Sequence, residues 1–158
     1  MIGCVEIKYG SKGKIGGIKM RYERYEDTYV LRVDRGEEVV EKIKEMCEKE
    51  NIELAEITGL GAANSVEVGL FNTKTKEYKT KVLEGIFEIT SLVGNVTNKD
   101  GEVYSHLHIN ISDETNIVKG GHLVKCRISA TSEIFVRKIN GKVGRKFNEE
   151  IGLNLLNY

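Results

Sequence analysis

The sequence predicts an α+β protein with a mostly antiparallel β-sheet and one principal amphipathic helix. Only one segment, which follows Asp34, repeats apolar residues at helical spacing. The rest consists of apolar runs separated by Gly, Asn and Asp, as is typical of consecutive strands. The 158 residues include 17 Gly and no Pro, so turns depend on Gly, Asn and Asp. A chain of this length suits one domain.

Residues 1–19 differ from the rest, because they are rich in glycine and follow no sustained period. We expect them to form an N-terminal extension that precedes a domain at residues 20–158. An alternative is that Met20 is the true start, because residues 16–19 are what an in-frame ribosome-binding site and spacer would encode.

The first predicted elements are a strand from Tyr22 to Val33 and the helix that follows it. Asp34 is the expected N-cap, and Glu37 stands in the capping-box position three residues later. Two ion pairs between residues four positions apart, Glu38 with Lys42 and Glu45 with Lys49, are expected on the solvent-exposed face of the helix. The apolar stripe consists of Val39, Val40, Ile43, Met46 and Cys47.

Strands are expected from there to the C-terminal region. The turn at residues 72–76 predicts a hairpin of residues 66–71 with 78–83, and residues 113–116 predict another turn between strands at 104–111 and 122–127. Asn140-Gly141 predicts a tight hairpin at the end of a strand at 129–139. Two further strands are expected at residues 54–63 and 87–96.

The charge balance bears on the classes of partner. Lys and Arg number 24, as do Asp and Glu, so the formal net charge of zero argues against a dedicated duplex-DNA binder. No apolar run is long enough to predict a membrane-spanning helix or a membrane partner. Cys4, Cys47 and Cys126 are scattered and odd in number, which favours free thiols in a reducing cytoplasm. Cys47 and Cys126 stand in apolar patterns and are expected to be buried.

All three histidines of the chain lie within a short span and form a candidate metal site. His106 and His108 are two residues apart, so on a strand they share a face, and His122 is expected on the neighbouring strand. Three imidazoles are suitable ligands for zinc or another divalent ion, with a fourth position left for water, a carboxylate or a ligand. His122 has the same parity as Cys126, which should face the core. Either a bulge at Gly120-Gly121 turns His122 outward, or His122 lies at a pocket rim.

Several segments, taken in order, resemble the plants and prokaryotes conserved (PPC) domain family. The matching segments span roughly residues 22–156 and are LRVDRGEE at 31–38, ITGLGA at 57–62, LEGIFEITSLVGN at 83–95, HLH at 106–108, GGHL at 120–123, ATSE at 130–133 and GLNLL at 152–156. The resemblance implies an α+β fold that assembles as a homotrimer, with a metal at His106, His108 and His122. It also implies DNA as a partner, because plant relatives carry AT-hook segments, although a chain without Pro cannot contain that motif.

Three functions follow as hypotheses. The first is a trimeric metal-containing binding or regulatory protein, with zinc as the expected metal and DNA, a protein or a small ligand as partner. The second is an enzyme whose three-histidine site holds an activated water, with Glu88 as the pocket carboxylate that the family alignment suggests. The third is a structural metal site. The fourth ligand distinguishes them: an open position favours the enzyme and a closed coordination sphere favours structure.

Two basic runs are weaker candidates. Lys74, Lys76, Lys79 and Lys81 are expected to form a solvated strand edge. The second run contains Arg137, Lys138, Lys142, Arg145 and Lys146, and it lacks the interleaved aromatic residues of a single-strand binder.

Overall fold

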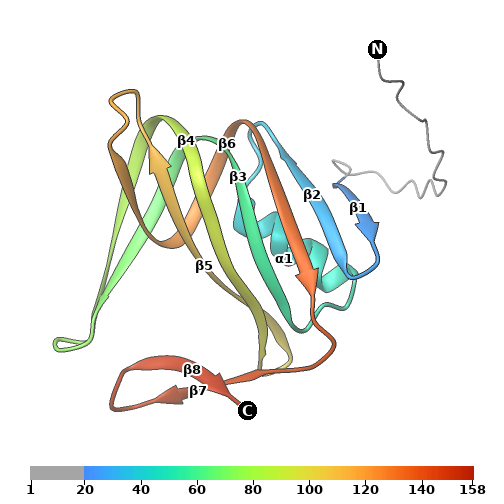
Figure 1. Cartoon of the computed structure of the whole chain (residues 1–158). Coiled ribbons are helices and arrows are strands. Elements are labelled where there is room, and N and C mark those ends of the chain that lie inside the picture. The colour runs from blue at the N-terminus through green and yellow to red at the C-terminus, as the bar shows by residue number, and fades with distance from the viewer. Residues whose placement is uncertain (1–19) are drawn as a thin grey trace.

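The computed structural model describes residues 20–158, so the predicted extension at residues 1–19 lies outside the described part (Figure 1). One helix accompanies eight strands in this part, which confirms the predicted α+β class. The elements are β1 (Arg21–Tyr25), β2 (Thr28–Asp34), α1 (Val39–Lys49), β3 (Ala55–Asn72), β4 (Glu77–Lys99), β5 (Glu102–Ser112), β6 (Val118–Lys138), β7 (Gly144–Asn148) and β8 (Leu153–Asn157).

Six strands form one antiparallel sheet in the order β1-β2-β6-β3-β4-β5. The first part of β6 also pairs with β5, so that β3, β4, β5 and β6 close on themselves. The hairpin of β7 and β8 lies beside one end of this closed unit (Figure 1). The length of β6 makes the closure possible, because this strand of 21 residues pairs with β5 at residues 118–122 and with β2 at residues 131–137.

The helix begins later than the sequence predicted, and its N-cap is Glu38 and not Asp34. The Glu38 carboxylate accepts hydrogen bonds from the backbone N–H groups of Val40 and Glu41. Asp34 instead begins a turn, in which its backbone C=O accepts from Glu37 N–H and its N–H donates to the Glu37 carboxylate. Gly36, with φ +85°, allows this extra turn before the helix.

The predicted Glu38–Lys42 ion pair does not form, because Glu38 is occupied by capping and by a hydrogen bond from the backbone N–H of Cys126. Lys42 pairs instead with Glu37 at 3.6 Å and Glu45 at 2.9 Å. The predicted apolar stripe is confirmed: Val39, Ile43, Met46 and Cys47 are buried, and Val40 is half-buried.

The core lies where α1 packs against β5 and β6. The side chains buried there alternate along the strands; β6, for example, contributes Ile134 and Val136. Cys47 and Cys126 are free and buried, as the sequence predicted. No helix in residues 20–158 is long and apolar enough to cross a membrane.

Two predictions about turns are wrong. The expected single strand at residues 22–33 is a hairpin of β1 and β2, because the chain reverses at Glu26, whose φ is +52°. Asn140-Gly141 does not form a hairpin with the preceding strand, since β7 pairs with β8. The segment around Asn140-Gly141 is instead bonded to other parts of the chain: Ile139 N–H donates to Leu54 C=O, and Val143 C=O accepts from Asn98 N–H.

Candidate metal centre

The three histidines come together where β5 meets the first part of β6. His106 and His108 lie on one face of β5, and the alternate residues Leu107 and Ile109 are buried on the other face, as predicted. His108 is directly opposite His122 in the register of β5 and β6. The pairing of these strands therefore places all three imidazoles on one face of the sheet.

A one-residue bulge at Val124 gives His122 its outward direction. Lys125 pairs with Glu67 and Leu123 pairs with Val68, so Val124 is an extra residue on β6. Leu123 and Cys126 are consequently both buried, although their parities differ.

The bulge predicted at Gly120-Gly121 is therefore wrong in position, since both glycines pair in regular register with β5. Gly120 is needed for close packing instead, because a Cβ there would lie 2.2 Å from the Ile109 backbone oxygen.

The imidazoles are close enough to share one ion. One ligand nitrogen from each of the three residues lies within 4.8 Å of the others, and the ring centroids are 5.2–5.6 Å apart. In a tetrahedral zinc site with Zn–N distances of about 2.0–2.1 Å, nitrogens are about 3.4 Å apart. The separation of 4.8 Å is an upper limit, so one ion placed between the three rings is near all three nitrogens. The donor set fits a divalent ion of the zinc type.

Burial keeps two of these imidazoles in the form that binds metal. The pKa of His106 is lowered by burial first, then by the charges of His122, Arg145 and His108. The pKa of His122 is lowered by burial and by His108. Because only neutral imidazole coordinates a metal, both residues are ready to bind at neutral pH. His106 and His122 are half-buried, whereas His108 is exposed.

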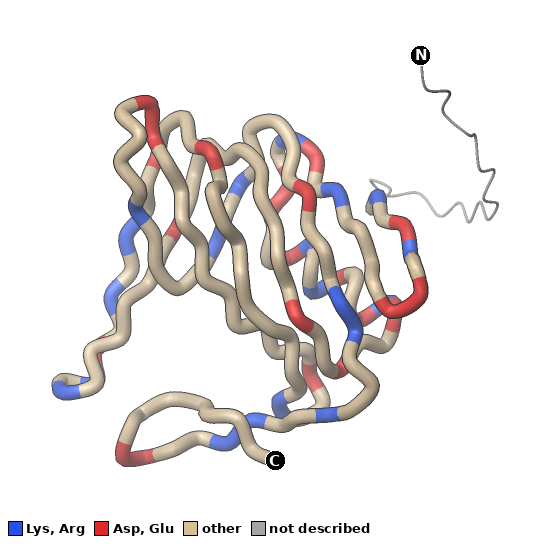
Figure 2. Tube along the Cα trace, viewed as in Figure 1, with Lys and Arg blue, Asp and Glu red and all other residues tan. Residues whose placement is uncertain are grey.

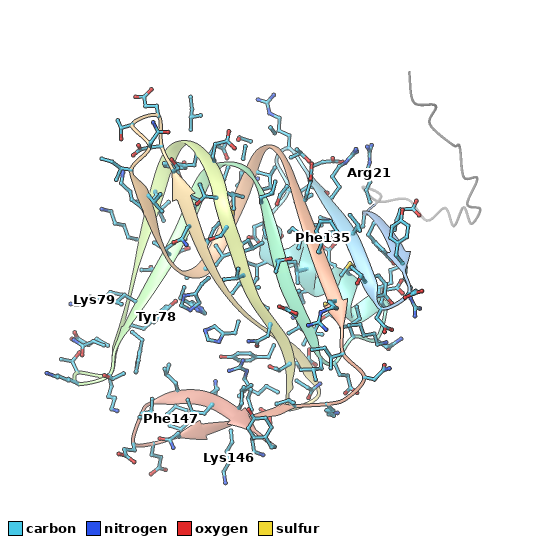
Figure 3. All side chains as sticks on the ribbon, in the orientation of Figure 1. Arg21, Tyr78, Lys79, Phe135, Lys146 and Phe147 are labelled. Atoms are coloured by element: carbon cyan, nitrogen blue, oxygen red, sulfur yellow. The ribbon has the colours of Figure 1, made fainter. Side chains whose placement is uncertain are left out.

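Two glycines let neighbouring groups approach the site. A Cβ on Gly94 of β4 would lie 2.1 Å from the backbone oxygen of His106, so glycine at this position permits the close approach of β4 to β5. A Cβ on Gly69 would overlap the Tyr78 hydroxyl, because Tyr78 packs over Gly69. The Tyr78 ring also makes an edge contact with His122 at 6.1 Å between centroids. Tyr78 lies on the part of β4 that approaches the hairpin carrying Phe147 (Figure 3).

Arg145 is a site residue that the sequence reasoning counted only as one of a basic run. Its guanidinium donates to the Thr97 side-chain oxygen at 2.8 Å, the Asn95 side-chain oxygen at 2.9 Å and the Asn154 backbone oxygen at 3.0 Å. It also lies over the Tyr104 ring at 4.6 Å. Asn95 is directly opposite His106 in the register of β4 and β5, which places the guanidinium beside the histidines. No local pattern signals this role, because Arg145 reaches the site from β7.

Glu88 does not belong to the histidine group. It is exposed and lies opposite Ser112, four residues along β5 from His108. At about 3.3 Å per residue, this register separates the two positions by roughly 13 Å along the strand.

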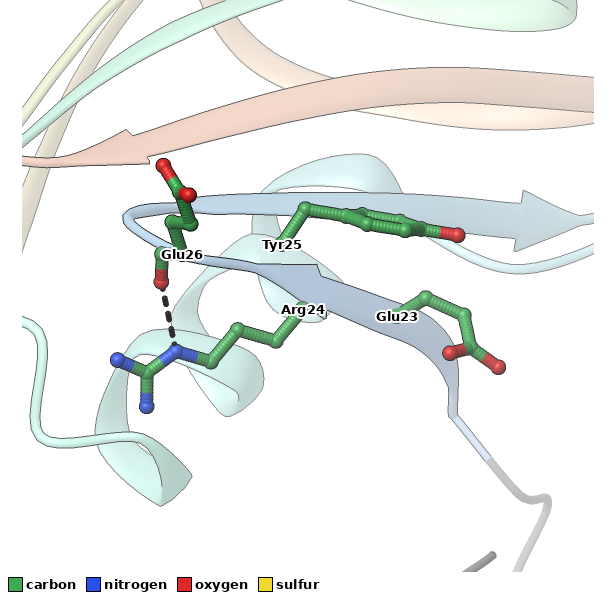
Figure 4. Close-up of a pocket in the computed structure, with 4 residues that line it drawn as sticks. All are labelled: Glu23, Arg24, Tyr25 and Glu26. Atoms are coloured by element: carbon green, nitrogen blue, oxygen red, sulfur yellow. Dashed lines mark hydrogen bonds between the residues drawn. The ribbon is translucent and has the colours of Figure 1, made fainter. Parts of the chain in front are cut away.

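The other candidate features are the lysine run and a surface depression. The lysines at 74, 76, 79 and 81 are exposed, as predicted. Blue and red segments are interspersed along the chain in Figure 2, and the central strands are mostly uncharged. A shallow depression of about 400 Å³ is lined by Glu23, Arg24, Tyr25 and Glu26 (Figure 4). It adjoins the far end of β6, since Tyr25 pairs with Thr28 and Thr28 with Arg137.

Comparison with known proteins gives a family and several related structures. The family model described as the Plants and Prokaryotes Conserved (PCC) domain matches residues 20–140. A plant- and prokaryote-conserved (PPC) protein of Pyrococcus horikoshii is 40% identical, with 92% of this chain and 98% of that chain covered and a TM-score of 0.78. A protein of Archaeoglobus fulgidus, described as metal-containing, is 32% identical over 91% of this chain and 100% of that chain, with a TM-score of 0.78.

A third structure, from Bacteroides thetaiotaomicron, is described as a candidate DNA-binding protein. It is 28% identical over 87% of this chain and 96% of that chain, with a TM-score of 0.85. The comparison with curated proteins gave no match.

Proposed function

Because the chain belongs to the Plants and Prokaryotes Conserved domain family, we propose that it is a metal-containing binding or regulatory protein whose centre is His106, His108 and His122. The observation that carries the proposal is the convergence of three ligand nitrogens within 4.8 Å. A related protein of Archaeoglobus fulgidus is described as metal-containing, which supports the proposed metal centre.

Zinc is the metal that we propose for this centre. Three neutral imidazoles are borderline ligands that zinc accepts in tetrahedral geometry, with one position left for an exchangeable ligand. When bound, the ion supplies a Lewis-acid centre that can coordinate an oxygen of a ligand. The exposure of His108 gives such a ligand access from solvent.

Two observations favour binding over the alternative functions. A closed structural site needs a fourth protein ligand, and the ligand group within residues 20–158 consists of the three histidines. Hydrolysis by an activated water needs a nearby general base, and Glu88 is placed four residues along the strand from His108.

We also propose that the protein assembles as a homotrimer, through exposed apolar side chains that lie beside the histidine centre on the same face of the sheet and leave His108 open to solvent. A row of paired residues crosses this face from Phe135 through Thr58 and Val93 to His108. Phe135 and Val93 are 48% and 47% exposed, and Leu60 on the same face is 55% exposed. Several exposed apolar side chains on one face are typical of an interface. Sedimentation equilibrium at micromolar concentration is expected to give three times the chain mass, and a monomer would contradict this assembly.

DNA is the second candidate partner, supported by the description of the relative from Bacteroides thetaiotaomicron. The exposed lysines of the β3–β4 hairpin are the groups that would contact phosphates. The net charge of zero predicts weak binding that falls steeply with salt. Fluorescence anisotropy with a labelled duplex, at two salt concentrations, tests this candidate.

Elemental analysis by mass spectrometry tests the metal centre. The purified protein without an affinity tag is expected to carry about one metal ion per chain, because the three histidines form one site. A His106→Ala/His108→Ala variant is expected to carry almost none. Asn110→Ala is the matched control, since Asn110 is exposed on the same face of β5 and is not a ligand.

Equal metal content in the wild type and the double-histidine variant would contradict the proposed site. A wild type that neither carries nor takes up zinc, nickel, cobalt or copper would contradict the proposed function as a whole. Circular dichroism of both variants shows whether the fold is intact, so that unfolding is not mistaken for loss of a ligand.

A further inference from the structure

Arg145 is an unusual neighbour for a metal centre, because its charge is compensated by no carboxylate within the described residues. Its three hydrogen-bond acceptors, on Thr97, Asn95 and Asn154, are all neutral oxygens. The nearby Tyr104 ring attracts the cation through its face. A half-buried guanidinium with only neutral partners leaves a net positive charge beside the histidines.

The guanidinium also has hydrogen-bonding capacity to spare. Arginine carries five N–H donors, and three of those of Arg145 are used. The three bonds and the ring contact fix the guanidinium plane, so the other donors keep a defined direction. A fixed guanidinium is well suited to bind a carboxylate or phosphate through two parallel hydrogen bonds.

The distance between Arg145 and the three histidines limits the size of a molecule that can contact both. Tyr104, under the guanidinium, and His106 lie two residues apart on the same face of β5, which corresponds to about 6.7 Å along a strand. Asn95, which holds the guanidinium, is directly opposite His106. A molecule with two oxygen groups a few bonds apart can reach both the histidine centre and Arg145.

We propose that the site binds a small organic anion, with one oxygen group on the metal and a second oxyanion group on Arg145. The second group is a carboxylate or a phosphate, which share the chemistry that a guanidinium recognises. This proposal rests on the metal function proposed above. It names the ligand class of that centre, and it assigns Arg145 as the residue that selects for negative charge.

The two effects of Arg145 have to be separated in the test. Its bonds to Thr97 and Asn95 of β4 also hold the β7–β8 hairpin against the sheet, so a substitution can disturb structure as well as binding. Discrimination between ligands by the wild-type protein avoids this difficulty. A lysine at this position keeps the charge without the two-pronged geometry, which provides a second variant.

The experiment uses the Co²⁺-loaded protein, whose visible spectrum reports changes in coordination. Malonate and phosphonoacetate are the anionic probes, and malonamide is a neutral probe of similar size. We expect both anions to change the spectrum at millimolar concentration or below, and malonamide to bind at least tenfold more weakly. A difference in affinity between the two anions shows whether the site prefers a ligand with a phosphonate group over a dicarboxylate.

Two variants complete the test. Arg145→Met is expected to weaken anion binding at least tenfold while Co²⁺ affinity stays within about twofold, and Arg145→Lys is expected to lie between this variant and the wild type. Arg137→Met is the matched control, because Arg137 is an exposed arginine paired with Glu56 at the far end of β6. Its binding of all three probes should equal that of the wild type.

Each outcome distinguishes the two proposals. If the protein does not bind Co²⁺, the metal function fails and the ligand class fails with it. If Co²⁺ binds but malonamide competes equally with the anions, or Arg145→Met binds the anions like the wild type, only the anion proposal is overturned.

Discussion

The two halves of β6 differ in what they contribute, although they belong to one strand. The first half, up to Leu123, pairs with β5 and presents His122 on the open face of the sheet. The second half pairs with β3 and, over residues 131–137, also with β2, and it buries Cys126, Ile128, Ile134 and Val136. Val124, the bulge residue between the two halves, reverses the alternation of side chains between the two faces of the sheet. The comparison shows that one inserted residue lets a core strand also carry a metal ligand.

Deletion of Val124 is the strongest way to break this comparison. Without the extra residue, the two halves share one alternation, so either His122 turns toward the core or the buried residues turn outward. We expect the deletion to lower metal affinity at least 100-fold or to prevent folding. Val124→Ala keeps the residue count and should retain both properties. A folded deletion variant that binds metal like the wild type would show that the bulge does not direct His122.

The substitution Ile134→Ala is expected to affect only the second half of β6, the core half, which follows Val124. The side chain is fully buried, and its truncation removes apolar contacts and leaves a cavity, which costs about 2–5 kcal/mol of unfolding free energy. Urea denaturation measures this loss. Glu133→Ala, an exposed neighbour on the same strand, should change the value by less than about 0.5 kcal/mol. Metal content per folded chain is expected to be unchanged in both variants, and loss of metal from Ile134→Ala would mean that the halves are coupled.

Titratable residues in the two halves of β6 should also make the stability of the fold depend on pH in opposite directions. Burial raises the pKa of the Cys126 thiol to about 12, from its ordinary value of 9.0. The unfolded chain therefore releases this proton near pH 9 while the folded chain keeps it, so stability falls as pH rises. From pH 8 to 9.5 the contribution is about 0.8 kcal/mol for one thiol. His122, with its lowered pKa, has the opposite sign, since the unfolded chain takes up its proton first as pH falls below 6.5.

Urea denaturation of the wild type and Cys126→Ala at pH 8 and 9.5 measures the alkaline effect, because the variant lacks the thiol. The loss of stability between the two pH values should be smaller in the variant by about the calculated amount. Equal losses in the two proteins would mean that Cys126 titrates in the folded state as it does in the unfolded chain.

Local patterns account for the parts that the sequence predicted well. Helical spacing identified α1, and alternation placed His106 and His108 on one face with Leu107 buried behind them. The turns at residues 72–76 and 113–116 were also recognisable from their polar residues.

The features that the sequence did not predict depend on contacts between distant segments. Arg145 reaches the site only because the β7–β8 hairpin docks on β4, and no spacing in the sequence specifies that docking. The bulge falls at Val124 and not at the glycines, because the register with β3 decides its place. The helix N-cap is Glu38 and not the predicted Asp34, because the Glu38 carboxylate also accepts a hydrogen bond from the backbone of β6.

The pairing of β5 with β6 also has a consequence for the order in which the chain folds. The three ligands span residues 106–122, joined by one short turn, whereas the core half pairs Leu31 with Ile134, residues about a hundred positions apart. Local hairpins form in microseconds, and contacts between distant residues wait for slower loop closure. During synthesis His122 leaves the ribosome before any residue of the core half of β6. The chain therefore completes its metal ligands before it can complete its core.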